Sequence, residues 1–294
     1  MRAEERAIRI AIACSIIGAI SKAAAGVVTG SMSMISSAVD SLGDLFVSIA
    51  NLFVVRYGDQ PADEDHNYGH AKIEGLGAMF EGGFIFAAGL FIVYEAIHKA
   101  LIGEESHDST LGIVVMLPIL GITVATVMHL RKVAKQTGSL VVKSDALHYM
   151  TDVWVNVGVL VSLALVKITG KPIIDSIVSV GIALFMLKSA VGVVREGFDV
   201  VMDKSLEADV VKQLTDMLGA CPSIASFHDF KTRRGRIPHV DFHVVVAPDM
   251  SAKAVHDLFL DLQNKVREIV GPSTKVLMHA DPAEHPVPDE VPAT

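Results

Sequence analysis

Cysteine, aromatic residues and charge are all scarce in this sequence. The 294 residues include two Cys, one Trp and four Tyr; aromatic residues make up 6% and charged residues 20%. Two Cys exclude a disulfide-rich scaffold and a zinc finger built on cysteine ligands. The low aromatic content excludes an outer-membrane barrel with aromatic girdles. A net charge of −8 argues against a nucleic-acid-binding protein, so no nucleic-acid partner is expected.

Hydrophobic residues are abundant instead, and they come in long blocks. They make up 51% of the chain, and the mean hydropathy is +0.47. About 20 apolar residues are needed for a helix to cross the hydrocarbon core of a bilayer. Six blocks reach that length, and they predict membrane-spanning helices at about 8–28, 33–57, 73–99, 110–131, 140–167 and 173–201. Residues 1–204 are therefore expected to form a six-helix transmembrane domain in the lipid bilayer.

Lysine and arginine predict the orientation of these helices. Basic residues gather near the N-terminus and in the segments around Arg56, Lys72 and Arg131, whereas the loops at the other ends of the helices carry few. Because cytoplasmic loops are enriched in basic residues, we expect both chain termini to lie in the cytoplasm.

The composition changes after residue 204. Residues 205–282 read as helix, strand, strand, helix, strand, with Ser251 as the N-cap of the second helix. This αββαβ order predicts a small α+β, ferredoxin-like cytoplasmic domain. The last segment, 283–294, is rich in proline and is expected to be disordered. The fold class is thus a mainly α membrane protein with a small soluble domain.

Two pairs of ionisable residues interrupt the apolar helices. Asp40 and Asp44 are four residues apart, as are His148 and Asp152, so each pair projects from one helix face. A carboxylate near the bilayer centre costs roughly 2.5–3.5 kcal/mol on insertion scales. Three carboxylates and one imidazole suit a tetrahedral Zn²⁺ ion. The competing interpretation is that each polar group only bonds across a helix seam.

Three further ionisable residues within the helices have less informative surroundings. Glu81 is interpreted as a carboxylate at a helix seam, Asp145 as a charge at a helix terminus, and Lys22 as a side chain that reaches toward the membrane surface.

The segment between the second and third helices contains a weaker signal. Asp63, His66 and His70 form a D-x-x-H-x-x-x-H cluster, which offers one carboxylate and two imidazoles to a second metal ion. A polar loop with two ordinary histidines explains the same residues equally well.

The soluble domain carries a third set of candidate ligands: His228, His243, His256, His279 and Asp281. Strand alternation places His243 on the face opposite to Val240, Phe242 and Val244, away from the core. A carboxylate two residues after a histidine could bridge two metal ions. Separate surface histidines are the alternative.

Taken together, these motifs resemble the cation diffusion facilitator family, in particular its bacterial zinc and ferrous-iron efflux branch. The resemblance is carried by SMSMISSAVDSLGD, DEDHNYGHAKIE, HYMTD, FHDF, DFHV, AVHD and LMHADP, and it runs from about residue 8 to 282. It implies a transport site at Asp40, Asp44, His148 and Asp152, a loop site at Asp63, His66 and His70, and a binuclear cytoplasmic site at His228, His243, His256, His279 and Asp281.

The same resemblance implies a homodimer in the bacterial inner membrane. Such a protein exchanges cytoplasmic Zn²⁺, or Fe²⁺, Cd²⁺ or Mn²⁺, for protons by alternating access, with His148 as the expected titrating group. The resemblance also implies a charged interlock between Lys72 and Asp203. Ala280 replaces a polar residue found in some relatives, which would weaken the cytoplasmic site.

Two other functions are weighed against export. An intramembrane metalloenzyme would need an activated water and a general base, as in H-E-x-x-H, and that motif is absent from the sequence. A membrane-anchored metal sensor without transport would not need buried carboxylates in its helices. We therefore expect a proton-coupled exporter rather than an enzyme.

Overall fold

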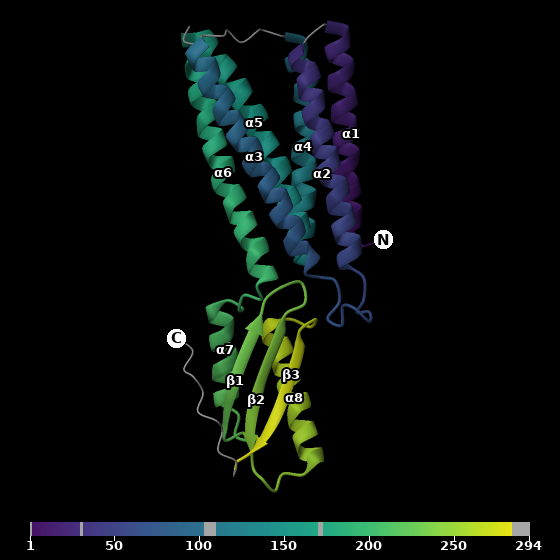
Figure 1. Cartoon of the computed structure of the whole chain (residues 1–294), viewed down its shortest axis with the longest axis vertical. Coiled ribbons are helices and arrows are strands. Elements are labelled where there is room, and N and C mark those ends of the chain that lie inside the picture. The colour runs from purple at the N-terminus through teal and green to yellow at the C-terminus, as the bar shows by residue number, and fades with distance from the viewer. Residues whose placement is uncertain (1, 30–31, 103–109, 170–172, 284–294) are drawn as a thin grey trace. The chain divides into compact units, whose positions relative to one another are not determined.

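A computed structural model describes residues 2–29, 32–102, 110–169 and 173–283 (Figure 1). The chain divides into two compact units, residues 1–199 and 200–294. The predicted tail 283–294 lies, apart from Ala283, outside the described residues.

The first unit consists of six long helices, at the positions that the apolar blocks predict. They are α1 (Ala3–Thr29), α2 (Met32–Gly58), α3 (Ile73–Ile102), α4 (Thr110–Thr137), α5 (Leu140–Thr169) and α6 (Ile173–Val201). Among the described residues, five helices are long and apolar enough to cross a membrane. The sixth long helix, α5, is not among these five, and several of its side chains after Gly158 lie outside the described residues. A sixth span therefore stays a prediction.

The six helices form two groups that meet at one end of the unit. Figure 1 shows α1, α2 and α4 in one group and α3, α5 and α6 in the other, separated in the upper part of the picture. The largest apolar cluster of this unit joins the start of α1 to the ends of α2 and α4 and the start of α5, and includes Ile8, Val55, Leu130 and Val142. This cluster fixes the end of the unit where the chain crosses from α4 to α5.

The crossing from α4 to α5 takes only two residues. Gly138 adopts a positive φ of 69°, a conformation that glycine accepts without steric cost, and its N–H donates to the carbonyl of Ala134. Glu74 of α3 then accepts hydrogen bonds from the Ser139 hydroxyl at 2.9 Å and from the backbone N–H of Leu140 at 3.1 Å. This carboxylate caps the first turn of α5, where unpaired N–H groups favour a negative charge.

The second unit contains α7 (Ala208–Gly219), β1 (Ser226–Arg233), β2 (His239–Val246), α8 (Ala252–Val270) and β3 (Lys275–Pro282). The predicted order of helices and strands is confirmed, and the Ser251 hydroxyl caps α8 by accepting from the N–H of Ala254. A ferredoxin-like classification of this unit stays a prediction.

The three strands form one sheet in the order β1-β2-β3, with β1 and β2 antiparallel and β2 and β3 parallel. The core lies on one face of this sheet, where Val240, Phe242 and Val244 pack against Leu214 of α7 and Leu262 of α8.

Close packing between α3 and α6 generates the first testable prediction. A Cβ added at Gly197 would lie 2.5 Å from the carbonyl oxygen of Gly75, a backbone atom that cannot move aside cheaply. Gly197→Ala should therefore destabilise the bundle by about 1–3 kcal/mol, the usual cost of overpacking. Gly192→Ala on the same helix is the matched control, because its Cβ would meet nothing within 4 Å. Thermal unfolding in detergent compares the two, and equal melting temperatures would contradict this packing.

Candidate metal sites

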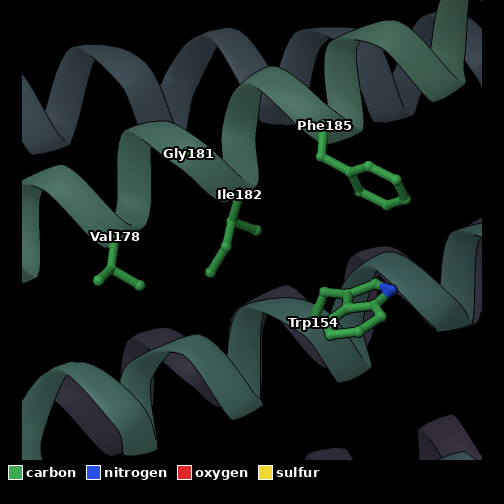
Figure 2. Close-up of a pocket in the computed structure, with 5 residues that line it drawn as sticks. All are labelled: Trp154, Val178, Gly181, Ile182 and Phe185. Carbon is green, nitrogen blue, oxygen red and sulfur yellow. The ribbon is translucent and has the colours of Figure 1, made fainter.

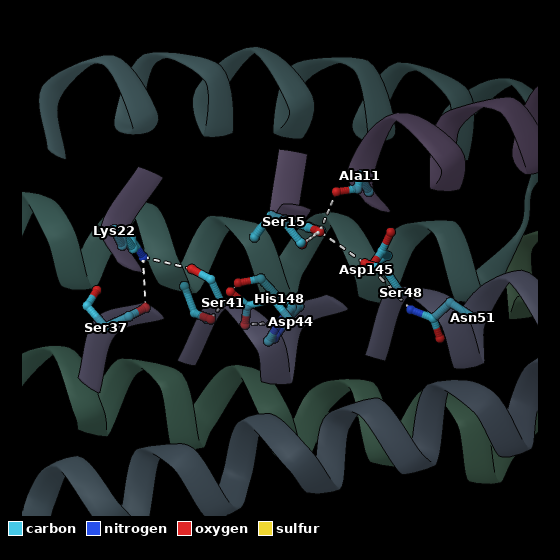
Figure 3. Close-up of polar contacts among 12 residues, drawn as sticks. Ala11, Ser15, Lys22, Ser37, Ser41, Asp44, Ser48, Asn51, Asp145 and His148 are labelled. Carbon is cyan, nitrogen blue, oxygen red and sulfur yellow. Dashed lines mark hydrogen bonds and ion pairs between the residues drawn. The ribbon is translucent and has the colours of Figure 1, made fainter. Parts of the chain in front are cut away.

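Helices α2 and α5 bring three ionisable side chains together inside the first unit. Figure 3 shows two of them, Asp44 and His148. Asp44, His148 and Asp152 each offer a ligand atom within 4.8 Å of the others. Nε2 of His148 lies 3.1 Å from Oδ1 of Asp44, and the His148 ring is buried. The other ring nitrogen, Nδ1, is also buried and has no hydrogen-bond partner among the described residues.

These separations suit a metal ion. Ligands held about 2.0–2.1 Å from a tetrahedral Zn²⁺ lie about 3.3 Å from one another. The 3.1 Å between Asp44 and His148 is close to that value, and two carboxylates with one neutral imidazole are borderline-hard ligands that several divalent transition metals accept.

Asp40 is the fourth residue of the predicted transport set, and it does not join this cluster. Its side chain is exposed, whereas Asp44 is partly buried. The group of three ligand atoms does not include Asp40.

A tyrosine that the sequence analysis did not single out lies beside the cluster. The hydroxyl of Tyr149 donates to the carbonyl oxygen of Ala11 at 2.9 Å, and the hydroxyls of Ser15 and Ser48 approach it at 2.6 and 3.0 Å. Tyr149 therefore connects α1, α2 and α5 immediately next to His148. The residue was visible in the HYMTD motif, but nothing in a single tyrosine predicts such a role.

Two interpretations made from the sequence are wrong. Lys22 does not reach toward the membrane surface: it is buried, and its ammonium donates to the Ser41 hydroxyl at 2.9 Å and to the carbonyl of Ser37 at 3.4 Å. Asp145 is not an exposed helix-terminal charge, because it is fully buried against α2. In both cases neighbouring helices cover a position that looks terminal along the chain.

The loop cluster forms as the spacing predicts. The two carboxylate oxygens of Asp63 each face one histidine. Oδ2 lies 3.3 Å from Nε2 of His70, and Oδ1 lies 3.3 Å from Nδ1 of His66. Nδ1 of His70 contacts the carbonyl oxygen of Pro61 at 3.2 Å, an arrangement that leaves Nε2 to face the carboxylate and a metal ion. The backbone N–H of His66 donates to Asp63 at 2.6 Å and holds the pKa of that carboxyl below its usual range.

Three histidines form one row across the sheet of the second unit. His228 pairs with His243 across β1 and β2, and His243 pairs with His279 across β2 and β3. All three lie on the face opposite to the packed core. Oδ2 of Asp281 lies 3.3 Å from Nδ1 of His243 and 3.4 Å from Nε2 of His228, yet it has no hydrogen-bond partner among the described residues. A buried carboxylate oxygen that faces two ring nitrogens could ligate a metal ion together with them.

A carboxylate missed by the sequence analysis borders this row. Asp229 sits at a bulge in β1 with a positive φ of 47°, and its Oδ2 lies 3.8 Å from Nε2 of His243. A hydrogen bond from Lys231 lowers the pKa of Asp229, so the carboxylate stays ionised. His256, by contrast, is exposed on α8 and does not belong to the group of ligand atoms in one protomer.

The predicted interlock joins residues of the two separate units. Lys72 belongs to the first unit and Asp203 to the second, so the interlock stays a prediction. Within its own unit, Asp203 lies 3.6 Å from the guanidinium of Arg233.

An apolar pocket of about 390 Å³ lies between α5 and α6 (Figure 2). Trp154 of α5 lines it together with Val178, Gly181, Ile182 and Phe185 of α6. None of these side chains can ligate a cation. The pocket is therefore no part of a metal site.

Comparisons with known proteins identify the family of the chain. The family model described as "Cation efflux transmembrane domain" matches residues 8–202, and the one described as "Cation efflux protein, cytoplasmic domain" matches residues 206–283. The chain belongs to the cation efflux family, also called the cation diffusion facilitators, which are membrane transporters and not enzymes.

Within that family, the chain is similar to cation-efflux pumps of the FieF type. It is 34% identical over 255 residues to "Cation-efflux pump FieF" of Yersinia pestis (strain Pestoides F), covering 86% of this chain and 84% of the relative. The values are the same for the FieF pump of Yersinia pseudotuberculosis serotype O:3 (strain YPIII). These matches support metal-cation efflux across a bacterial inner membrane, and the cytoplasmic domain supports homodimer formation.

The row of histidines generates the second testable prediction. Asp281→Asn should lower the number of zinc ions bound per chain, because it replaces the charged oxygen that faces both His228 and His243. Asp216→Asn is the matched control, since that carboxylate only pairs with Lys212 on the surface of α7. Equilibrium dialysis of the full-length protein in detergent measures the ratio. Equal zinc binding by both variants would mean that the histidines are ordinary surface residues.

Proposed function

We propose that this protein exports divalent transition-metal cations from the cytoplasm in exchange for protons, by alternating access. The observation that carries the proposal is the group formed by Asp44, His148 and Asp152 on two facing helices of the bundle. Zn²⁺ fits this set, and Fe²⁺, Mn²⁺ and Cd²⁺ are the other substrates to consider. We retain Asp40 as a fourth ligand, which would have to turn toward the group during the cycle.

In this proposal α5 is the sixth membrane-spanning helix. Its second half, from Val153 on, is mostly apolar, and Asp152 in its first half belongs to the proposed site. Intramembrane ionisable residues are costly, and they face the bundle interior where they act. With six spans, both termini lie in the cytoplasm, as the distribution of lysine and arginine predicts.

The chemistry of His148 provides the exchange. A neutral imidazole can give the lone pair of Nε2 to a metal ion, whereas a protonated one has no lone pair and donates that N–H instead. Oδ1 of Asp44 lies 3.1 Å from this same nitrogen. Asp44 can therefore ligate the metal together with a neutral His148, or accept a hydrogen bond from the N–H of a protonated His148. Metal and proton thus compete for one atom, which couples their movements in opposite directions.

The other two clusters take supporting roles. We propose that the loop site at Asp63, His66 and His70 binds a second metal ion. The cytoplasmic site then binds two ions through His228, His243, His256, His279 and Asp281, and it stabilises the homodimer together with the Lys72–Asp203 interlock. A sensor that does not transport would not need the α2–α5 group.

The third prediction tests the transport site directly. Asp152→Asn should abolish Zn²⁺ uptake into proteoliposomes, because it removes a charged ligand while keeping the side-chain shape. Insertion should not suffer, since the substitution removes a carboxylate from the apolar bundle. Glu196→Gln is the control, because that carboxylate pairs with Lys143 at the surface and should leave the flux unchanged. Near-normal flux through Asp152→Asn would reject the assignment.

The fourth prediction concerns the counter-ion. Zn²⁺ uptake should increase with an imposed pH gradient and fall when an ionophore collapses that gradient. His148→Asp should shift the preference from Zn²⁺ toward Mn²⁺, because it replaces the only nitrogen ligand by a hard oxygen. Flux that ignores the gradient would rule out proton exchange, and an unchanged metal preference would remove His148 from the site.

A further inference from the structure

A second group of buried polar side chains lies along the same two helices. Asn51 follows Asp44 by seven residues on α2, and Asp145 precedes Asp152 by seven residues on α5. Seven residues span about 10 Å of helix. Both residues therefore lie about two turns nearer to the end of the bundle where α2 ends and α5 begins, and Figure 3 shows them beyond Asp44 and His148.

Glu81 of α3 completes this group. The side chains of Glu81, Asp145 and Asn51 are all buried, the two carboxyls with no exposed surface at all. Nδ2 of Asn51 donates to Oδ1 of Asp145 at 3.2 Å, and the Ser144 hydroxyl bonds to Oε2 of Glu81.

One oxygen of each carboxyl remains without a partner. Oε1 of Glu81 and Oδ2 of Asp145 are fully buried, and no donor among the described residues reaches either of them. Polar atoms in a protein interior are rarely left unpaired, because an unmade hydrogen bond costs about 1–3 kcal/mol and more for a charged group. Each of these two oxygens therefore needs a partner that the described residues do not supply.

The charged neighbours of the pair are few. Among the described residues, Asp145 and His148 act on Glu81, whereas His148 and Asp44 act on Asp145. His148, when protonated, is the positive group among them. Neither lysine nor arginine is among those neighbours, and Lys22 lies toward the opposite end of the row in Figure 3. The negative charge of the two carboxyls therefore lies in the interior of the bundle and not at its surface.

We propose that Glu81, Asp145 and Asn51 form a second intramembrane site for a hard divalent cation, separate from the Asp44–His148–Asp152 group. The site offers oxygen ligands: two carboxylates and the Ser144 hydroxyl beside Glu81, while Asn51 holds Asp145 through its Nδ2. Such sets suit Mn²⁺ and Mg²⁺, whereas imidazole nitrogen favours Zn²⁺. This role rests on the proposed function. The site binds the incoming cation on the cytoplasmic side, and the cation then moves on to His148.

The experiment measures Mn²⁺ binding to the full-length protein in detergent by electron paramagnetic resonance. The parent variant combines Asp152→Asn, His70→Ala and Asp281→Asn, which together weaken the other three metal groups. We expect this parent to retain one Mn²⁺ ion per chain. Adding Glu81→Gln should weaken that binding by at least about tenfold, as expected when a charged ligand is lost.

Asp145→Asn is the second variant, and it should reproduce the loss on the same parent. Glu196→Gln on that parent is the matched control and should bind as the parent does. Both test substitutions are nearly isosteric and remove a buried charge, so folding is checked by gel filtration and melting temperature. If either variant fails to fold, the other decides.

Two results would overturn the proposal. A parent that binds no Mn²⁺ shows that the group is not a metal site. Binding that neither Glu81→Gln nor Asp145→Asn changes shows that the two carboxyls merely share a proton. Because binding at equilibrium needs no flux, these results are independent of whether Asp152→Asn abolishes transport.

Discussion

Neutralisation of charge inside an apolar bundle is the constraint on which the rest of this structure depends. Asp44, Asp145 and Asp152 are carried by helices whose other side chains are mostly apolar. Each carboxylate must find a cation or a donor, since isolated charges are too costly to bury. Two polar contacts between α2 and α5 serve this need: Asn51 donates to Asp145, and His148 faces Asp44. The Tyr149 hydroxyl network holds the backbone around them. A metal transporter can supply the missing positive charge from its own cargo.

Sequence reasoning located the parts of the site that follow helix periodicity. The spacing of His148 and Asp152 places them on one face of any α-helix, and the structure brings them to Asp44. Sequence reasoning could not predict that Asp145 is buried, because burial near the start of a helix depends on which neighbouring helices cover that position.

The sheet illustrates the same limit in another form. Alternation along β2 correctly turned His243 away from the core, which is a property of a single strand. The alignment of His228, His243 and His279 in one row depends instead on the register between strands, which no single strand encodes. The bulge that brings Asp229 near the row has no sequence signal either. The geometry within one strand could therefore be predicted from the sequence. The contacts between residues of different strands could be determined only from the structure.

The two-residue crossing between α4 and α5 limits how this bundle can move. A linker of two residues spans at most about 7 Å even when extended, and Glu74 of α3 holds Ser139 in place. A slide of one helical turn, about 5.4 Å, between α4 and α5 would break that arrangement. These two helices thus behave as one stiff hairpin. Any movement that displaces His148 on α5 must therefore move α4 as well. Relative sliding of helices has to occur between helices that no short linker connects.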